Sequence, residues 1–226
     1  MYDLRNRFYS PDLGRFLQPD PIGFKGDGSN LYRYCGNDWA NRTDPMGLYQ
    51  IMPGFMDDKQ KMIEVAQPEI AASAEKTAEK IDKALAAGEK SKEFHEVKKT
   101  FEKITGKGSG TVEHMQRASQ LAKQVAHAFR DNGKEGYKIF PEHMGKGGRD
   151  PLGRGDRPGY WIRINVDKAF NNKIYSIKQT LTHESLHNAG VLYDYAYKWV
   201  HPDYEQLTPE KRSENPDNIV DLFEHL

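Results

Sequence analysis

The pattern of apolar and polar positions predicts helices over the middle of the chain. Residues 57–104 are rich in Ala, Glu and Lys, and opposite charges recur near the i,i+4 spacing of a helix. Gly88 interrupts this stretch, which predicts two solvated helices. A Gly, Ser and Lys connector at residues 106–110 precedes a third, amphipathic helix predicted at residues 112–129. We expect the first two helices to form a lead-in and not a site.

Two later runs alternate apolar and polar residues, as half-buried strands do. They lie at residues 137–140 and 160–166 and are rich in aromatic and β-branched side chains. We expect the second run to be an edge strand beside the helix that follows it. The residues between them, 144–159, contain many Gly with Lys and Arg but lack Walker spacing. This favours a mobile flap or hairpin tip near a cleft over a phosphate-binding loop.

A further helix is predicted over residues 171–188. Its apolar residues, from Ile174 to Leu186, recur at approximate helical spacing, and no Pro or Gly occurs before Gly190. The first 48 residues differ, because aromatic side chains alternate there with turn signals such as Asp20-Pro21. Such a segment favours short strands and tight turns.

Together these patterns predict an α+β chain that is mainly helical, with a small β-sheet and a β-rich segment in front. We divide it into that segment at residues 1–48, a helical lead-in or linker at 49–110, and the main domain at 111–226. Residues 49–55 are expected to be a flexible link between the first segment and the rest.

Composition narrows the class of protein. Lys plus Arg and Asp plus Glu are 33 each, divided as six and six up to Leu48 and 27 and 27 after it. This balance does not favour binding to nucleic acid or to an anionic membrane. The lone Cys35 excludes an internal disulfide framework, and no apolar run approaches the length of a membrane span. The first residues also lack the apolar core of a signal peptide.

The candidate chemistry lies in the last predicted helix. His183-Glu184-Ser185-Leu186-His187 is an H-E-x-x-H motif. Residues four apart share one helical face, so both imidazoles could bind one Zn²⁺ while Glu184 acts as the general base toward water. The alternative, a surface helix whose histidines bind nothing, is less favoured. The motif predicts a zinc hydrolase.

A catalytic zinc usually takes three protein ligands and a water. The metzincin spacing would require His at the position of Tyr193, so that class fits poorly. Several downstream residues therefore remain candidates for the third ligand: Asp194, His201, Asp203, Glu214 and Asp217.

The motif helix, the Asp194-x-x-Tyr197 step and the segment around Asn215 and Asp217 together resemble the deuterolysin-like aspzincin peptidases over residues of roughly 171–223. The resemblance implies that His183, His187 and Asp194 bind zinc, with Asp217, Glu214 or His201 as alternative third ligands. It also implies that Glu184 is the general base and that Tyr197 donates a hydrogen bond to the oxyanion. No Gly-Thr precedes Asp194, and Lys198 stands at the family's usual Gly position.

The first segment resembles the end of the Rhs/YD-repeat core. The motifs that carry this resemblance lie at residues 5–9, 14–17, 19–23 and 30–34 and at Asp44-Pro45-Met46-Gly47-Leu48. In that family the repeats form a β-shell around a C-terminal toxin. The resemblance implies a self-cleavage point after Leu48, with Asp20 and Asp44 as candidate aspartates and Arg7 as a support. These few strands cannot complete such a shell, so we expect the chain to be the product of a truncated gene, an orphan cassette left after recombination, or a piece of a longer protein.

Combining the two resemblances, we expect a polymorphic toxin with a zinc endopeptidase effector, made in a bacterial cytoplasm and delivered into a target cell. A protein substrate in that cell and a cognate immunity protein are the expected partners. Nucleic acid is not expected as a partner, and no membrane span is expected. Two alternatives remain: a catalytically silent zincin-like binding domain, and a metal-dependent nuclease toxin.

Overall fold

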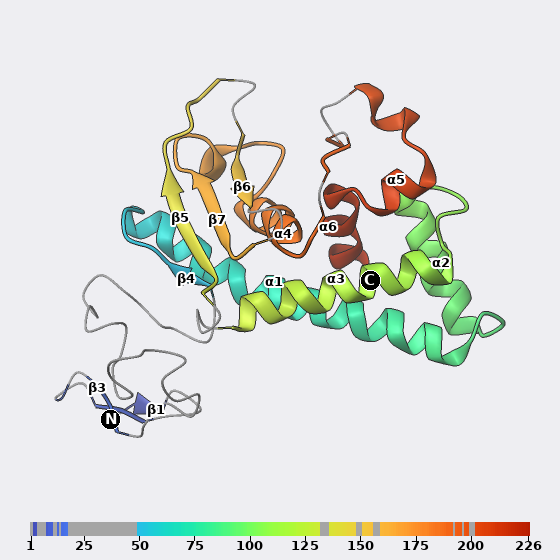
Figure 1. Cartoon of the computed structure of the whole chain (residues 1–226), viewed down its shortest axis with the longest axis horizontal. Coiled ribbons are helices and arrows are strands. Elements are labelled where there is room, and N and C mark those ends of the chain that lie inside the picture. The colour runs from blue at the N-terminus through green and yellow to red at the C-terminus, as the bar shows by residue number, and fades with distance from the viewer. Residues whose placement is uncertain are drawn as a thin grey trace.

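Two long helices and a small mixed β-sheet form the body of the protein (Figure 1). The structure is a computed structural model that describes residues 2–3, 8–10, 13, 15–17, 49–131, 136–147, 151–155, 159–191, 193–195, 197–198 and 202–226. The fold is α+β and mainly helical, which confirms the predicted class. No helix in these ranges is both long enough and apolar enough to cross a membrane.

Most of the α-helices begin where a side chain can bind a free backbone N–H group, although α1 does not. Ser91 and Thr111 cap α2 and α3, and Ser176 forms a reciprocal capping box with Gln179 at the start of α4. The helices are α1 (Asp57–Ala87), α2 (Lys92–Thr105), α3 (Val112–Arg130), α4 (Ile177–Asn188), α5 (Pro209–Ser213) and α6 (Pro216–His225), with short 3₁₀ turns η3 (Ala169–Asn171) and η4 (Pro202–Gln206). The two lead-in helices and the amphipathic third helix are confirmed.

The main sheet has the strand order β4-β5-β7-β6. Its strands are β4 (Gln50–Ile51), β5 (Lys138–Glu142), β6 (Gly153–Gly155) and β7 (Trp161–Asn165). β4 and β7 both pair parallel with β5, whereas β6 is antiparallel to β7. Ile139 and Ile162 are register partners, and both are fully buried in the core that the sheet shares with the helices.

The structure corrects the prediction of the edge strand. Residues 160–166 contain β7, but this strand is internal, because β5 pairs with one of its sides and β6 with the other. β6 comes from the Gly-rich segment and lies at the edge of the sheet beyond β7, with which it pairs antiparallel. Of the two forms expected for this segment, a mobile flap or a hairpin tip, the pairing agrees with the hairpin. β6 packs against the motif helix α4, so Gly153 and Gly155 lie in the sheet where it meets that helix.

The start of the motif helix also differs from the prediction. Helix α4 begins at Ile177 and not near residue 171, because the capping box of Ser176 fixes its first turn. Residues 169–171 form a separate 3₁₀ turn, and Ile174 is half exposed. The apolar pattern extended the helix too far toward the N-terminus, since it contains no information about the cap.

Residues 49–55 are not a simple flexible link. Gln50 and Ile51 form β4 in the sheet, and Tyr49 is only 2% exposed. The Tyr49 ring lies 4.6 Å from that of Phe129, and its hydroxyl accepts a hydrogen bond from Asn188 Nδ2 at 3.2 Å. Helix α1 contributes to the same core as α3, α4 and the sheet. Residues on both sides of position 110 therefore contribute to one core cluster.

The described parts of the first segment agree with the expected short strands. β1 (Tyr2–Asp3), β2 (Phe8–Ser10) and β3 (Arg15–Phe16) form an antiparallel sheet in sequential order. The residues expected to take part in self-cleavage lie outside the described part of the chain: Arg7, Asp20, Asp44 and Leu48.

A substitution can test whether Tyr49 belongs to the folded core. Replacing Tyr49 with Ala removes a buried aromatic side chain, so the free energy of unfolding should fall by about 3–5 kcal/mol. Tyr160→Ala is a matched control, because Tyr160 is 50% exposed, and it should cost about 1 kcal/mol or less. Urea denaturation followed by circular dichroism measures both. Equal, small effects would mean that Tyr49 belongs to a flexible link after all.

Candidate metal centre

The motif helix α4 crosses the interior of the protein. Every residue from Thr180 to Asn188 is buried, including both motif histidines and Glu184. The sheet strand β6, helices α1, α3 and α6, and the 3₁₀ turn η3 pack around it. A helix that is buried on all sides must satisfy its polar side chains within the protein. The partners of the two histidines therefore define the site.

The structure brings His183, His187 and Asp194 together. Asp194 Oδ1 lies 3.0 Å from His183 Nε2 and 3.2 Å from His187 Nε2. Single donor atoms of the three residues lie within 4.8 Å of one another. Asp194 lies beyond the end of α4, on the irregular segment that leads to η4. This cluster can hold a metal ion, and it contains the first of the predicted candidates for the third ligand.

The other nitrogen of each imidazole is already bound. His183 Nδ1 donates to Asp217 Oδ1 at 2.9 Å, and His187 Nδ1 donates to the carbonyl of Val191 at 2.7 Å. Both partners can only accept a hydrogen bond, so both Nδ1 atoms carry hydrogen. This leaves the Nε2 atoms as the ligand atoms, and hydrogen bonds of this kind orient histidines at metal sites in general.

Asp217 therefore lies behind His183 and does not join the cluster around Asp194. Its Oδ2 accepts hydrogen bonds from the Tyr175 hydroxyl and from the backbone N–H of Lys198, each at 2.9 Å. The carboxylate is 1% exposed and lies in the first turn of α6, where the helix dipole favours a negative charge. Burial and the neighbouring Asp217 raise the pKa of Tyr175, which keeps it a donor.

Electrostatics couple the cluster in the metal-free protein. Burial alone would lower the pKa of His183, but hydrogen bonds to Asp194 and Asp217 outweigh it and raise the pKa to about 10. Burial would raise the pKa of Asp194, but the hydrogen bonds from the two histidines hold it well below its usual range. The metal-free site thus contains an imidazolium beside a carboxylate, so a metal cation would replace a proton.

Glu184 lies on the side of α4 that faces the edge strand. A side chain at Gly153 would come within 3.0 Å of Glu184 Cγ, and one at Gly155 within 2.2 Å of the Glu184 carbonyl oxygen. Only glycine permits this approach of strand and helix. Burial raises the pKa of the Glu184 carboxyl, although the two histidines act in the opposite direction. A carboxylate with a raised pKa is a better proton acceptor near neutral pH.

Among the remaining predicted site residues, Tyr197 lies beside the cluster, whereas Glu214 and Asp203 do not join it. The Tyr197 ring stacks on that of His183, with centroids 6.0 Å apart, and is 42% exposed beside the site. Glu214 accepts a hydrogen bond from the Tyr195 hydroxyl at 3.2 Å and is not part of the cluster. His201 lies outside the described residues, and Asp203 is exposed in η4. Sequence reasoning missed Tyr175 and the Val191 carbonyl, for which no motif gives a signal.

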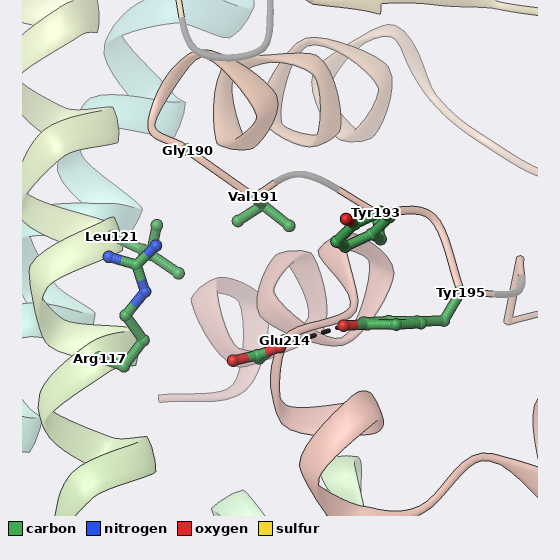
Figure 2. A pocket seen from close by; sticks show the side chains of 7 residues that line it. All are labelled: Arg117, Leu121, Gly190, Val191, Tyr193, Tyr195 and Glu214. Carbon is green, nitrogen blue, oxygen red and sulfur yellow. Dashed lines mark hydrogen bonds between the residues drawn. The ribbon is translucent and has the colours of Figure 1, made fainter.

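A small pocket adjoins the segment between His187 and Asp194 (Figure 2). Its volume is about 170 Å³, and Tyr193 and Tyr195, the two neighbours of Asp194 along the chain, both line it. The other lining residues are Arg117, Leu121, Gly190, Val191 and Glu214. None of the cluster residues lines this pocket, so it adjoins the metal centre and is not the centre itself.

The chemistry of the donors fits zinc. Two neutral imidazole nitrogens and one carboxylate oxygen form a set that catalytic zinc sites use, with room for a further ligand. Magnesium and calcium prefer oxygen ligands alone. The buried partners of both Nδ1 atoms add the outer hydrogen bonds that such a site requires.

Comparisons with known proteins give short matches. No protein-family model and no solved structure matches the chain. The uncharacterised protein YibJ of Escherichia coli K12 is 49% identical over 51 residues, which are 23% of this chain and 21% of YibJ. Double-stranded DNA deaminase toxin A of Burkholderia cenocepacia H111 is 52% identical over 42 residues, 19% of this chain and 3% of the toxin.

A second uncharacterised protein of Escherichia coli K12, YlbH, is 48% identical over 48 residues, 21% of this chain and 20% of YlbH. The chain therefore spans about a fifth or less of the length of each of these relatives. Most of this chain lies outside each match. What the comparisons show is a short stretch of similarity to a bacterial toxin and to each of two uncharacterised proteins.

The geometry predicts that replacing Asp194 and replacing Asp217 will have different effects on zinc binding. Wild-type protein should bind about one zinc per chain, and His183→Ala and Asp194→Ala should remove it. Asp217→Asn should retain the site but weaken affinity about 10–100-fold, because Asp217 orients His183 without binding the metal. Elemental mass spectrometry and chelator competition measure these effects, with the exposed Asp203→Asn as control. Full zinc binding by Asp194→Ala, with none by Asp217→Asn, would mean that Asp217 binds the metal and Asp194 does not.

The raised pKa of His183 predicts that metal binding depends on pH. The metal-free protein carries a proton on this imidazole that zinc must displace, so affinity should rise with pH by up to about tenfold per unit in the neutral range. Calorimetry in two buffers of different ionisation enthalpy counts the protons released. Affinity that is constant from pH 6 to 8 after correction for the buffer would contradict the imidazolium–carboxylate arrangement.

Proposed function

We propose that residues 49–226 form a zinc-dependent endopeptidase, the effector module of a polymorphic toxin. One observation carries the proposal: two imidazole Nε2 atoms and the Asp194 carboxylate converge, while buried acceptors hold both Nδ1 atoms. Zinc bound there would polarise a carbonyl group and activate a water molecule. The H-E-x-x-H motif then assigns the remaining roles to neighbouring side chains.

Glu184 is the proposed general base. It lies in the motif between the two histidine ligands, it is buried, and its pKa is raised, all of which suit the acceptance of a proton from water. It can later donate this proton to the leaving amine. Tyr197, exposed beside His183, is the proposed hydrogen-bond donor to the tetrahedral oxyanion.

The edge strand β6 gives a proposed path for the substrate. It packs directly on the motif helix at Glu184, and no strand in the described part of the chain pairs with its second edge. An extended peptide could add to this edge and pass the catalytic Glu184. This arrangement supports hydrolysis of peptide bonds within a protein substrate in place of phosphodiester cleavage. The equal numbers of acidic and basic residues do not favour a nuclease.

The short similarity to a toxin supports the proposed delivery. The matched stretches, 42 to 51 residues long, are similar in length to the 48 residues that resemble the end of an Rhs core. We propose that this segment connects the peptidase to a larger shell, with a cut after Leu48, and that the effector enters a target cell. A cognate immunity protein would then protect the producing cell.

Replacement of Glu184 separates binding from catalysis. Glu184→Gln should retain zinc but reduce peptide hydrolysis about 10²–10⁴-fold, because it removes the proton acceptor. The exposed Glu224→Gln on α6 is the matched control. Cleavage of a proteome-derived peptide library, read by mass spectrometry, measures activity without knowledge of the target. Zinc-loaded wild type that cleaves no peptide would favour the silent binding domain, and cleavage of DNA or RNA would favour the nuclease.

A further inference from the structure

Asp194 lies on the segment between α4 and η4, outside the helices and strands that the structure describes. Near the start of this segment, the N–H of Val191 bonds the carbonyl of Leu186 at the end of α4. Beyond Asp194, the Tyr195 hydroxyl bonds Glu214, and Lys198, four residues after Asp194, is attached to α6. The position of the carboxylate therefore depends in part on what holds Lys198.

Lys198 is tied to α6 at two points. Its backbone N–H donates to Asp217 Oδ2 at 2.9 Å, and its ammonium group forms an ion pair with the Asp221 carboxylate. Asp217 and Asp221 are four residues apart on one face of α6. The first of them is also the acceptor for His183 Nδ1. The same face of α6 therefore holds one histidine and the segment that carries Asp194.

The ion pair is largely removed from water. The side chain of Lys198 is 18% exposed and that of Asp221 is 10% exposed. Pairs on the surface contribute little, whereas breaking a buried pair leaves a charge without compensation. The ion pair between Lys198 and Asp221 is therefore able to fix the position of Lys198. The exposed ion pairs along α1 and α2 contribute less to the positions of their residues.

We propose that Lys198, through its ion pair with Asp221, is a positioning residue that holds Asp194 in place for the metal. The proposal rests on the proposed function, because it assumes that the cluster binds zinc. Lys198 does not touch the metal or the substrate in this role. Its contribution is to reduce the number of conformations that the segment from residue 193 to residue 198 must give up when the metal binds.

Zinc affinity measured against a chelator tests the proposal. Lys198→Met removes the charge but retains the length of the side chain, and the apparent Kd for zinc should rise about tenfold or more. Lys123→Met is the matched control, since Lys123 on α3 forms an ion pair with Asp82 on α1 at 2.6 Å. Lys123→Met should leave the Kd unchanged. Lys198→Arg should restore most of the affinity.

Asp221, the ion-pair partner of Lys198, provides a second variant for the same test. Asp221→Asn should weaken zinc binding in the same way, and the double variant should lose little more than either single variant, because both changes remove one interaction. Thermal unfolding of the metal-free proteins identifies a merely structural role. In that case Lys198→Met would lower the Tm of the metal-free protein but not change the zinc affinity of its folded form.

The outcomes separate the two proposals. If wild-type protein binds no zinc, the proposed function fails and the role of Lys198 fails with it. If wild type binds zinc and Lys198→Met binds it equally well, only the role of Lys198 is overturned. Weaker binding by Lys198→Met and Asp221→Asn, with normal binding by Lys123→Met, supports both.

Discussion

The burial of helix α4 is the constraint on which the rest of the structure depends. Its two histidines and Glu184 lie in the interior, where each polar atom needs a partner. The hydrogen bond from His183 Nδ1 to the buried Asp217 satisfies one of these needs and fixes the orientation of the ring. The Nε2 atoms of His183 and His187 then both contact Asp194. A centre able to hold a metal follows from the way the interior satisfies its own polar groups.

The same constraint explains the surroundings of the helix. Strand β6 can approach α4 closely only because Gly153 and Gly155 lack side chains, which places an edge strand beside Glu184. Helix α6 presents Asp217 and Asp221 on one face, and these residues hold His183 and Lys198. The cluster that could hold a metal lies in the part of the chain that begins at the buried Tyr49.

Local sequence patterns predicted many of the helices and strands. The charge pairs and Gly88 predicted α1 and α2, the apolar periodicity predicted α3, and alternation predicted β5 and β7. Each of these depends on residues close in sequence. One wrong prediction, the start of α4, concerns a helix cap. The others concern long-range pairing: β4 joins a sheet with residues almost 90 positions away, and β6, in place of β7, lies at an edge of the sheet. No local pattern shows which strands will be neighbours, because that depends on the packing of the whole chain.

For the candidate site, the sequence by itself determined the residues on the helix. Spacing of four places His183 and His187 on one face, whatever surrounds them. The sequence left the third ligand open among several carboxylates and a histidine, since periodicity within one helix does not show which residues outside that helix pack against it. The tertiary structure decided that Asp194 faces the Nε2 atoms and Asp217 the Nδ1 atom. The physical reason is that α6 and the segment after α4 pack on opposite sides of His183, and each buried nitrogen takes the carboxylate nearest to it.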